Sequence, residues 1–169
     1  GEWLRLSATG QILDKVRMIN DVPTLQPSVI ALDEQRAIAA LHDTGPGPGK
    51  VRIAITRDGG QRWQDEETAS IPNPNTPVAL IRLNSGQLLL AGNGQEGRGA
   101  LSLWLSADEG KSWQASRTVE AAADGGAEFS APVLLLGRDG RIHLTYTWRR
   151  EGIKHVSFTE AWLATGRQP

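Results

Sequence analysis

One eight-residue pattern occurs twice in this chain, and it is the strongest indication of the fold. Residues 56–63 read TRDGGQRW, and residues 106–113 read SADEGKSW. Both fit the pattern S/T-x-D-x-G-x-x-W, and the Asp and Trp of the second copy follow those of the first by 50 positions. Self-similarity at a fixed period of this length is the sequence signature of a repeat architecture.

The residues around the two stretches repeat as well. Apolar runs follow Pro27 and Pro77 at the same spacing of 50, and a third run follows Pro132, 55 positions after Pro77. Each run leads into turn residues and then a second apolar run. The turns at 84–86 and 138–140 contain the Asn, Asp and Gly residues that favour β-hairpins. Each repeat therefore opens with two predicted antiparallel strands.

A third and a fourth strand complete each repeat. Residues 51–56 and 101–106 alternate in side-chain character as a half-buried strand does, and more polar strands are expected at 63–69 and 113–119. Four short antiparallel strands in ~50 residues are typical of β-propeller blades and kelch-like repeats. The sequence predicts an all-β fold with about three four-stranded antiparallel blades, at residues 26–72, 76–121 and 130–162.

The first part of the chain does not complete a repeat. Residues 1–22 are predicted to form the tail of a preceding blade, with Ile12, Val16 and Ile19 as core positions, so that residues 1–169 make a partial β-propeller. Three blades do not close a ring, and exposed sheet edges invite pairing. We therefore expect either missing propeller blades or a second copy of the chain as a partner.

The composition narrows the classes of ligand. The chain has 18 Lys and Arg against 19 Asp and Glu, which gives no electrostatic case for nucleic acid or an anionic membrane surface as partner. No apolar run approaches the ~20 residues that span a bilayer. Cys is absent and the three His are scattered, so no metal site or other cofactor is expected. The compartment, cytoplasmic or exported, stays open.

The repeated eight-residue stretch resembles the Asp box of sialidases and related BNR-repeat propellers. In such a turn the Asp accepts backbone N–H bonds, the Gly supplies a positive φ, and the Trp buries its ring between strands. These residues are expected to be structural and to carry no chemistry: Asp58, Gly60, Trp63, Asp108, Gly110 and Trp113.

The resemblance covers the chain from about Gln26 to Trp162. It is carried by Gln26-Pro27-Ser28, by residues 71–75 (IPNPN), by Glu128-Phe129-Ser130 and by residues 141–148 (RIHLTYTW). These segments are similar to the C-terminal half of sialidase-like proteins. The resemblance implies a six-bladed propeller, of which this chain would supply the last three blades, and a glycan as substrate or ligand.

The topology of a blade also places a candidate site. The start of the first strand and the end of the second lie at one rim, and the innermost strands line the central axis. Polar residues gather at these places in all three repeats, and Lys154 joins them as part of a motif of the family. Glu128 is the candidate acid or base, and the candidate substrate-binding residues are Gln26, His42, Asp43, Asn73, Asn75, Asn93, Arg98, Ser130, Arg149 and Lys154.

Some of these residues have a simpler interpretation. Asn73 and Asn75 lie in a Pro-rich connection and are at least as well explained as turn residues. Arg149, with the neighbouring Arg150, also fits a solvated loop tip.

The residues that sialidases use in catalysis can be compared with those of this chain. Sialidases clamp the substrate carboxylate with Arg residues and use a Tyr nucleophile activated by a Glu. Relatives read Glu-Phe-Ser-Tyr-Pro where this chain has Ala131 in place of the Tyr. The single Tyr of the chain, Tyr146, is expected to pack within a second strand.

Two functions therefore remain open. The first is a divergent sialidase-like exo-glycosidase for sialic acid or another acidic sugar, of which these 169 residues alone should be inactive. The alternative is a non-catalytic propeller that binds glycan or protein. A lyase or a glycosidase of another specificity also fits, because the fold does not fix the function.

Overall fold

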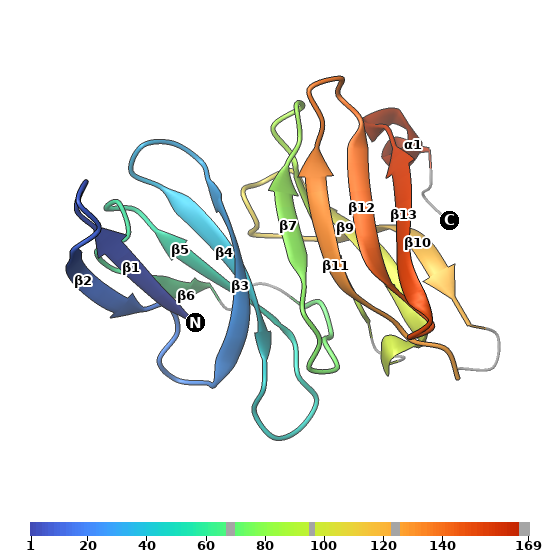
Figure 1. Cartoon of the computed structure of the whole chain (residues 1–169), viewed down its shortest axis with the longest axis horizontal. Coiled ribbons are helices and arrows are strands. Elements are labelled where there is room, and N and C mark those ends of the chain that lie inside the picture. The colour runs from blue at the N-terminus through green and yellow to red at the C-terminus, as the bar shows by residue number, and fades with distance from the viewer. Residues whose placement is uncertain (67–69, 95–96, 123–125, 166–169) are drawn as a thin grey trace.

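The computed structural model describes residues 1–66, 70–94, 97–122 and 126–165. Its strands form four antiparallel sheets, arranged one after another along the molecule (Figure 1). The first is the hairpin β1 (Glu2–Leu6) and β2 (Ile12–Arg17). The second has the order β3 (Thr24–Ala31), β4 (Ala37–Asp43), β5 (Val51–Thr56) and β6 (Gln64–Glu66).

The remaining two sheets follow the same antiparallel plan. The third has the order β7 (Ala79–Arg82), β8 (Leu88–Gly92), β9 (Ala100–Ser106) and β10 (Gln114–Ala121), with the one-turn 3-10 helix η1 (Gly97–Gly99) before β9. The fourth has the order β11 (Phe129–Leu136), β12 (Ile142–Trp148) and β13 (Gly152–Phe158), and the short helix α1 (Glu160–Ala164) follows it. The prediction of an all-β fold is confirmed; the part of the fourth predicted strand at 67–69 lies outside the described residues.

The core lies between stacked sheets, because the central strands are buried on both faces. In β8, Leu88 and Leu90 pack toward the second sheet, where they join Ile38 and Ile53. Leu89, which points the other way, belongs to a cluster shared with the fourth sheet. The period of two along a strand thus divides β8 between two cores.

The fourth sheet departs from the predicted four strands. After β13 the described chain turns into α1, whose N-cap Thr159 accepts a hydrogen bond from the Trp162 amide through its hydroxyl. The helix docks on β10, where the Ser116 hydroxyl donates to the Leu163 carbonyl at 3.1 Å and Arg117 donates to the Trp162 carbonyl. The prediction of a fourth strand before residue 162 is therefore wrong.

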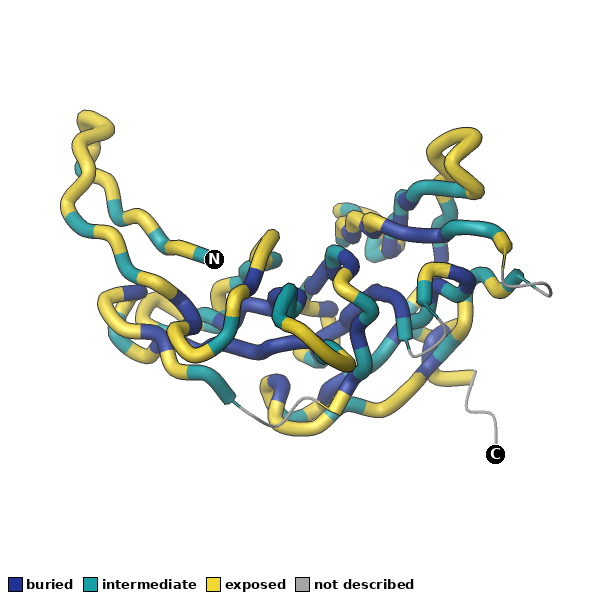
Figure 2. Tube along the Cα trace, turned by 90° about the horizontal axis from the view of Figure 1, so that it is seen from below, coloured by how far each residue is buried: buried dark blue, intermediate teal, exposed yellow. Residues whose placement is uncertain are grey.

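The hairpin β1–β2 contacts the second sheet through one face. Trp3 packs against Trp63 with the ring centroids 5.5 Å apart, and Ile19 is buried just after β2. Ile12, which we expected in the core, is 63% exposed, because the register places it opposite Leu6 on the outward face. Figure 2 shows the tip of the hairpin standing away from the rest of the chain.

The first of the two repeated turns joins β5 to β6. The hydroxyl of Thr56 accepts the Gly60 amide at 2.9 Å, and a carboxylate oxygen of Asp58 accepts the Arg62 amide at 2.9 Å. The Arg62 amide and guanidinium hold the pKa of Asp58 at about 2. Gly60 has a φ of +89°, and the ring of Trp63 is buried.

The second turn, between β9 and β10, repeats this network. Ser106 accepts the Gly110 amide at 2.8 Å, and Asp108 accepts the Ser112 amide at 2.9 Å. The hydroxyl and amide of Ser112 lower the pKa of Asp108 to about 2. Gly110 has a φ of +86°, while Trp113 is half-buried and donates from its indole N–H to the Gly110 carbonyl.

Among the described residues no helix is both long and apolar enough to cross a lipid bilayer.

Candidate functional site

The polar strand ends named by the sequence lie along one edge of the sheets. Thr24 pairs with Asp43, and Phe129 pairs with Trp148, so the start of each first strand lies beside the end of the second. These ends, with the loops that follow them, form the lower edge in Figure 1. We call it the mouth edge; the two repeated turns follow the far ends of β5 and β9 and lie at the opposite edge.

Glu128 is the centre of the most strongly charged contact at the mouth edge. One carboxylate oxygen accepts hydrogen bonds from the Ser130 hydroxyl at 2.6 Å and from Arg98 at 2.8 Å, and the other accepts from Arg150 at 2.5 Å. The Ser130 hydroxyl, together with the two guanidinium groups, lowers the pKa of Glu128 to about 2. The carboxylate is therefore ionised at neutral pH and is a weak base.

The guanidinium groups keep most of their donors free. The Arg98 side chain is 43% exposed and that of Arg150 is 75% exposed, whereas the Glu128 side chain is 14% exposed. Each Arg uses one N–H on Glu128, and within the described residues neither guanidinium makes another hydrogen bond. A guanidinium has five N–H donors in a planar fork that matches a carboxylate. The cluster can thus receive an anion.

Arg149 and Lys154, both predicted to bind substrate, do not contact the Glu128 carboxylate. Arg149 donates only its backbone N–H to the Glu128 carbonyl, and its guanidinium lies 5.3 Å from the ring centroid of Trp148. Lys154 pairs instead with Glu120 on the neighbouring sheet. The sequence placed both Arg149 and Arg150 at this rim, and in the structure it is the Arg150 side chain that bonds the Glu128 carboxylate.

The same Glu120 engages the only Tyr. The Tyr146 hydroxyl donates to Glu120 at 2.7 Å, and the Tyr146 side chain is buried between the third and fourth sheets. Burial, together with the bond to Glu120, raises the pKa of the phenol above its ordinary value. Burial alone would raise the pKa of Glu120, but the bonds from Lys154 and Tyr146 bring it below its usual range. A buried phenol with a raised pKa is a poor nucleophile.

Two strands carry the same β-bulge where they reach the mouth edge. Between Leu25 and Ser28, and again between Ser130 and Val133, two residues oppose a single residue of the partner strand. The first residue of each bulge has a positive φ, +49° at Gln26 and +51° at Ala131, and a Pro follows each. Gln26 and Ala131 are therefore equivalent positions, 105 residues apart, and Gln26 is exposed.

His42 and Asn93 lie buried behind the edge. The Asn93 amide donates to the carbonyls of Ala100 and Phe129, at 2.6 and 2.7 Å, and so ties the third sheet to the fourth. Neither ring nitrogen of His42 has a hydrogen bond of ordinary geometry in the described residues. Burial lowers the pKa of His42, the backbone of Thr76 opposes this, and the charge of Arg98 lowers it further. Burial of the ring thus favours the neutral form of His42.

Asp43, Asn73 and Asn75 line a cleft of about 760 Å³ at the mouth edge. Asn73 is buried and closes a turn, because its side chain both donates to and accepts from the backbone of Thr76. Asn75 is exposed, with a φ of +57°. Asp43 is half-buried and accepts the Gly45 amide at 2.7 Å. Asn73 thus has the turn role that we had kept as an alternative.

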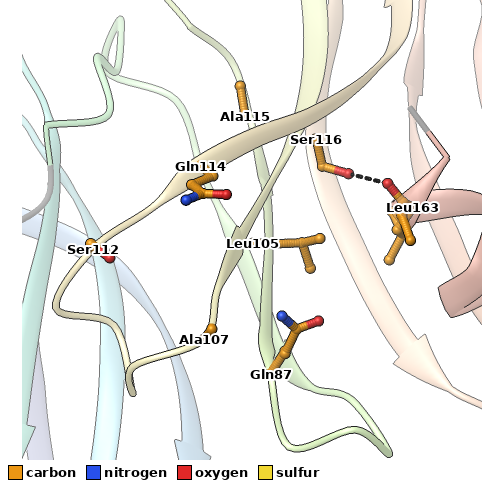
Figure 3. A pocket seen from close by; sticks show the side chains of 9 residues that line it. Gln87, Leu105, Ala107, Ser112, Gln114, Ala115, Ser116 and Leu163 are labelled. Carbon is orange, nitrogen blue, oxygen red and sulfur yellow. Dashed lines mark hydrogen bonds between the residues drawn. The ribbon is translucent and has the colours of Figure 1, made fainter. Parts of the chain in front are cut away.

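A second pocket, of about 460 Å³, lies between β10 and α1 (Figure 3). Gln87, Leu105, Gln114 and Ser116 are among its lining residues, and Ser116 is already bonded to Leu163. None of the lining residues that the structure describes has an ionisable side chain, so these residues offer no acid, base or charged anchor. In the described part of the chain, no three His, Asp or Glu side chains are placed to hold a metal ion.

Comparison with known proteins identifies the family. A family model described as a BNR repeat-like domain matches residues 1–144. The chain therefore belongs to the BNR repeat-like family, and its resemblance to sialidase-like propellers is confirmed. No curated protein sequence matches this chain.

Solved structures share the fold at low sequence identity. The intramolecular trans-sialidase from Ruminococcus gnavus is 17% identical with a TM-score of 0.68, and 92% of this chain aligns with 37% of it. The α-L-arabinofuranosidase of Fusarium graminearum is 16% identical with a TM-score of 0.62, and 80% of this chain aligns with 45% of it. The NanB sialidase from Streptococcus pneumoniae is 12% identical with a TM-score of 0.65, and 92% of this chain aligns with 26% of it. The chain thus spans less than half the length of each of these glycoside-acting proteins.

Proposed function

We propose that this chain forms the acid-recognising part of a glycan-binding propeller of the sialidase-like family. The observation that carries the proposal is the Glu128 carboxylate, which holds the guanidinium groups of Arg98 and Arg150 at 2.8 and 2.5 Å. The two Arg residues come from different sheets and meet at the mouth edge. An acidic sugar, such as sialic acid, is the ligand class that fits paired, partly free guanidinium groups on this fold.

In this proposal Glu128 is a positioning residue for the two Arg side chains. With a pKa of about 2 it stays ionised over the physiological range and is a poor proton donor. One carboxylate and two guanidinium groups leave a net charge of about +1, which favours binding of a carboxylate. The role that we propose for Glu128 is therefore orientation of the two Arg side chains, in place of the acid or base expected from the sequence.

The same geometry favours binding over catalysis by this chain alone. Ala131 has no nucleophilic atom, and the hydroxyl of Tyr146 is buried against Glu120. A full exo-glycosidase would then take its nucleophile from residues other than these two. A non-catalytic glycan-binding propeller needs no such residue, and Ala131 is the observation that supports this second candidate.

We further propose that the chain is completed by other propeller blades. The outward face of the hairpin exposes Leu4, Leu6, Ile12 and Leu13, and the outward face of the fourth sheet exposes Val133, Leu135 and Ile153. These two apolar faces lie at opposite ends of the row of sheets (Figure 1). Stacked sheets would bury both, as the inner sheets already bury theirs, and the partial coverage of the solved relatives supports this arrangement.

Isothermal titration with N-acetylneuraminic acid tests the binding proposal. We expect the double variant Arg98→Ala/Arg150→Ala to lose at least about tenfold in affinity, because hydrogen bonds between charged groups are lost. Arg141→Ala is the matched control, since Arg141 bonds Ser157 beyond the far end of β12. Unchanged affinity in the double variant, or an equal loss in the control, would overturn the proposal. No hydrolysis of an activated sialoside is expected from the 169 residues alone.

A further inference from the structure

Two of the three histidines lie side by side on the fourth sheet, the last of the row in Figure 1. His143 of β12 and His155 of β13 face each other, with Nδ1 of His143 3.0 Å from Nε2 of His155. The ring planes are inclined by 10°, and the ring centroids are 5.2 Å apart. The sequence did not predict this pair, because only the register of two strands brings the two residues together.

The pairing of β12 with β13 fixes where the two rings lie. His143 is opposite Ser157, and His155 is opposite Thr145, so the histidines are diagonal neighbours on one face of the sheet. Diagonal neighbours on paired strands are about 7–8 Å apart, within reach of long side chains. His143 is half-buried and His155 is exposed, so the pair is accessible from outside the sheet.

The separation of the two facing nitrogens fits two ligands of one metal ion. Imidazole nitrogen binds Zn²⁺ at about 2.0–2.1 Å, which places two adjacent nitrogen ligands about 2.9–3.4 Å apart for bond angles of about 90–109°. The observed 3.0 Å is near the right-angled end of this range. Square-planar and tetragonal coordination by nitrogen and oxygen is typical of Cu²⁺, which also binds most tightly among the first-row divalent ions.

A metal ion would take the place of the proton that the two rings share. A neutral imidazole has one N–H and one lone pair, so in the hydrogen-bonded pair one facing nitrogen donates and the other accepts. Binding of an ion requires a lone pair on both. The donor ring then carries its proton on its other nitrogen, and both rings stay neutral. Rotation of each ring about its Cβ–Cγ bond turns the two lone pairs toward a common point.

The turn before β12 supplies the charges beside the pair. Arg141 donates to the Ser157 hydroxyl at 2.9 Å, and its charge opposes that of a bound cation. Asp139 offsets this charge: a Cβ built at Gly137 would lie 2.5 Å from Oδ1 of Asp139 and 3.1 Å from Nε2 of His143. The carboxylate is thus close to the outer nitrogen of His143. A carboxylate in this position favours a proton on Nε2 and leaves Nδ1 available to a metal ion.

We propose that His143 and His155 form a binding site for a divalent transition metal ion, with Cu²⁺ as the preferred ion. The two imidazoles supply two adjacent ligands, and water takes the other positions. This proposal revises the expectation, drawn from scattered histidines, that the chain has no metal site. It is independent of the proposed glycan site. The pair shares its face of the sheet with Val133, Leu135 and Ile153, so the ion would lie beneath any blade that covers this face.

Titration of the full chain with Cu²⁺ against a competing chelator, followed by electron paramagnetic resonance, tests the proposal. We expect one tightly bound Cu²⁺ per chain, with hyperfine splitting from two imidazole nitrogens. Removal of a ligand should cost at least as much as removal of a group that orients one, so His143→Gln and His155→Gln should each weaken binding by at least about 10–100-fold. Thr147→Ala is the matched control, because Thr147 lies on the same strand and face as His143, and it should bind as the wild type does.

Zn²⁺, which is diamagnetic, locates the ion by NMR in the wild type, so this measurement does not depend on the folding of a variant. Zn²⁺ should shift the ring proton signals of His143 and His155 and leave those of the buried His42 unchanged. Mg²⁺, which prefers oxygen ligands, should shift none of them. Absence of saturable Cu²⁺ binding, binding that survives in both Gln variants, or Zn²⁺ shifts confined to other residues would each overturn the proposal.

Discussion

The two edges of the sheets differ in how closely they repeat. At the edge of the repeated turns, a hydroxyl accepts the Gly amide at 2.9 Å in one sheet and 2.8 Å in the next, and the Asp accepts an amide at 2.9 Å in both. At the mouth edge the bulge recurs at Gln26 and Ala131, but the side chains differ. The edge of the repeated turns thus repeats its hydrogen bonds from one sheet to the next. The mouth edge repeats a backbone conformation, the bulge, but not the side chains that it carries.

This difference indicates that the repeated turns stabilise the fold, whereas the mouth edge is suited to ligand recognition. The hydrogen bonds that close each turn are made by its own eight residues, so the same bonds can recur in more than one sheet. A ligand site needs different side chains at equivalent places, because each contacts a different part of the ligand. The comparison therefore predicts that substitutions at the repeated turns act on folding, and that those at the mouth edge act mainly on binding.

A substitution in one of the repeated turns should lower the stability of the fold most. Gly110→Ala adds a Cβ that would lie 2.5 Å from the δ-methyl of Ile38, at a φ of +86°. Overpacking and the left-handed backbone together should lower the free energy of unfolding by about 3 kcal/mol. Gly10→Ala is the control, with a φ of +82° and no neighbour within 4 Å, and should cost about 1 kcal/mol. Equal losses in urea denaturation would contradict the packing argument.

A smaller effect tests the electrostatics of the same turn. The folded pKa of Asp108 is about 2, below its ordinary 3.8, so its contribution to stability is present above about pH 4 and is lost as the pH falls toward 2. Asp108→Asn should cost about 1 kcal/mol at neutral pH, since the partly exposed group is screened by solvent.

The check on Asp108 is the pH dependence of unfolding. Urea denaturation of the wild type between pH 5 and pH 2, taken beside the variant, should show the two curves approaching each other as the pH falls. Parallel curves over this range would show that the carboxylate does not gain its low pKa from the folded turn.

The smallest expected effect is at the mouth edge. Ala131→Gly and Gln26→Gly relieve about 1 kcal/mol of left-handed strain, and the extra freedom of Gly in the unfolded chain cancels about half of it. Both variants should gain about 0.5 kcal/mol in thermal or urea unfolding. Ala115→Gly, in the exposed part of β10, should instead lose about 0.5–1 kcal/mol. A loss at both positions would contradict the strain argument, and a gain at one position with a loss at the other would show that the two bulges are not equivalent.

The sequence predicted the sheets well where their signals are local. The repeated turns and the alternation at 51–56 and 101–106 fixed the positions of β5 and β9, and β12 spans Ile142–Trp148 as expected. Ile12 was misplaced because a register shift between Arg5 and Leu6 interrupts the alternation of β2, which otherwise places Val16 on the packed face as expected. α1 was missed because a five-residue helix is shorter than any periodic signal.

The site was harder to predict than the fold. Blade topology brought Glu128, Arg98 and Ser130 to one edge from the sequence alone, and the structure joins them in one cluster. It gave no way to choose Arg150 over Arg149, because the choice depends on a loop in which both residues have positive φ. Lys154 was grouped with the site by a family motif, whereas its partner Glu120 comes from the neighbouring sheet.

The contact between Trp3 and Trp63 makes the first hairpin optically visible. Two indoles with centroids 5.5 Å apart and planes inclined at 56° have coupled electronic transitions, which produce a paired positive and negative band in the far-ultraviolet circular dichroism. The band would vanish if the hairpin detached while the remaining sheets stayed intact. The molecule therefore carries its own spectroscopic reporter for the docking of residues 1–22.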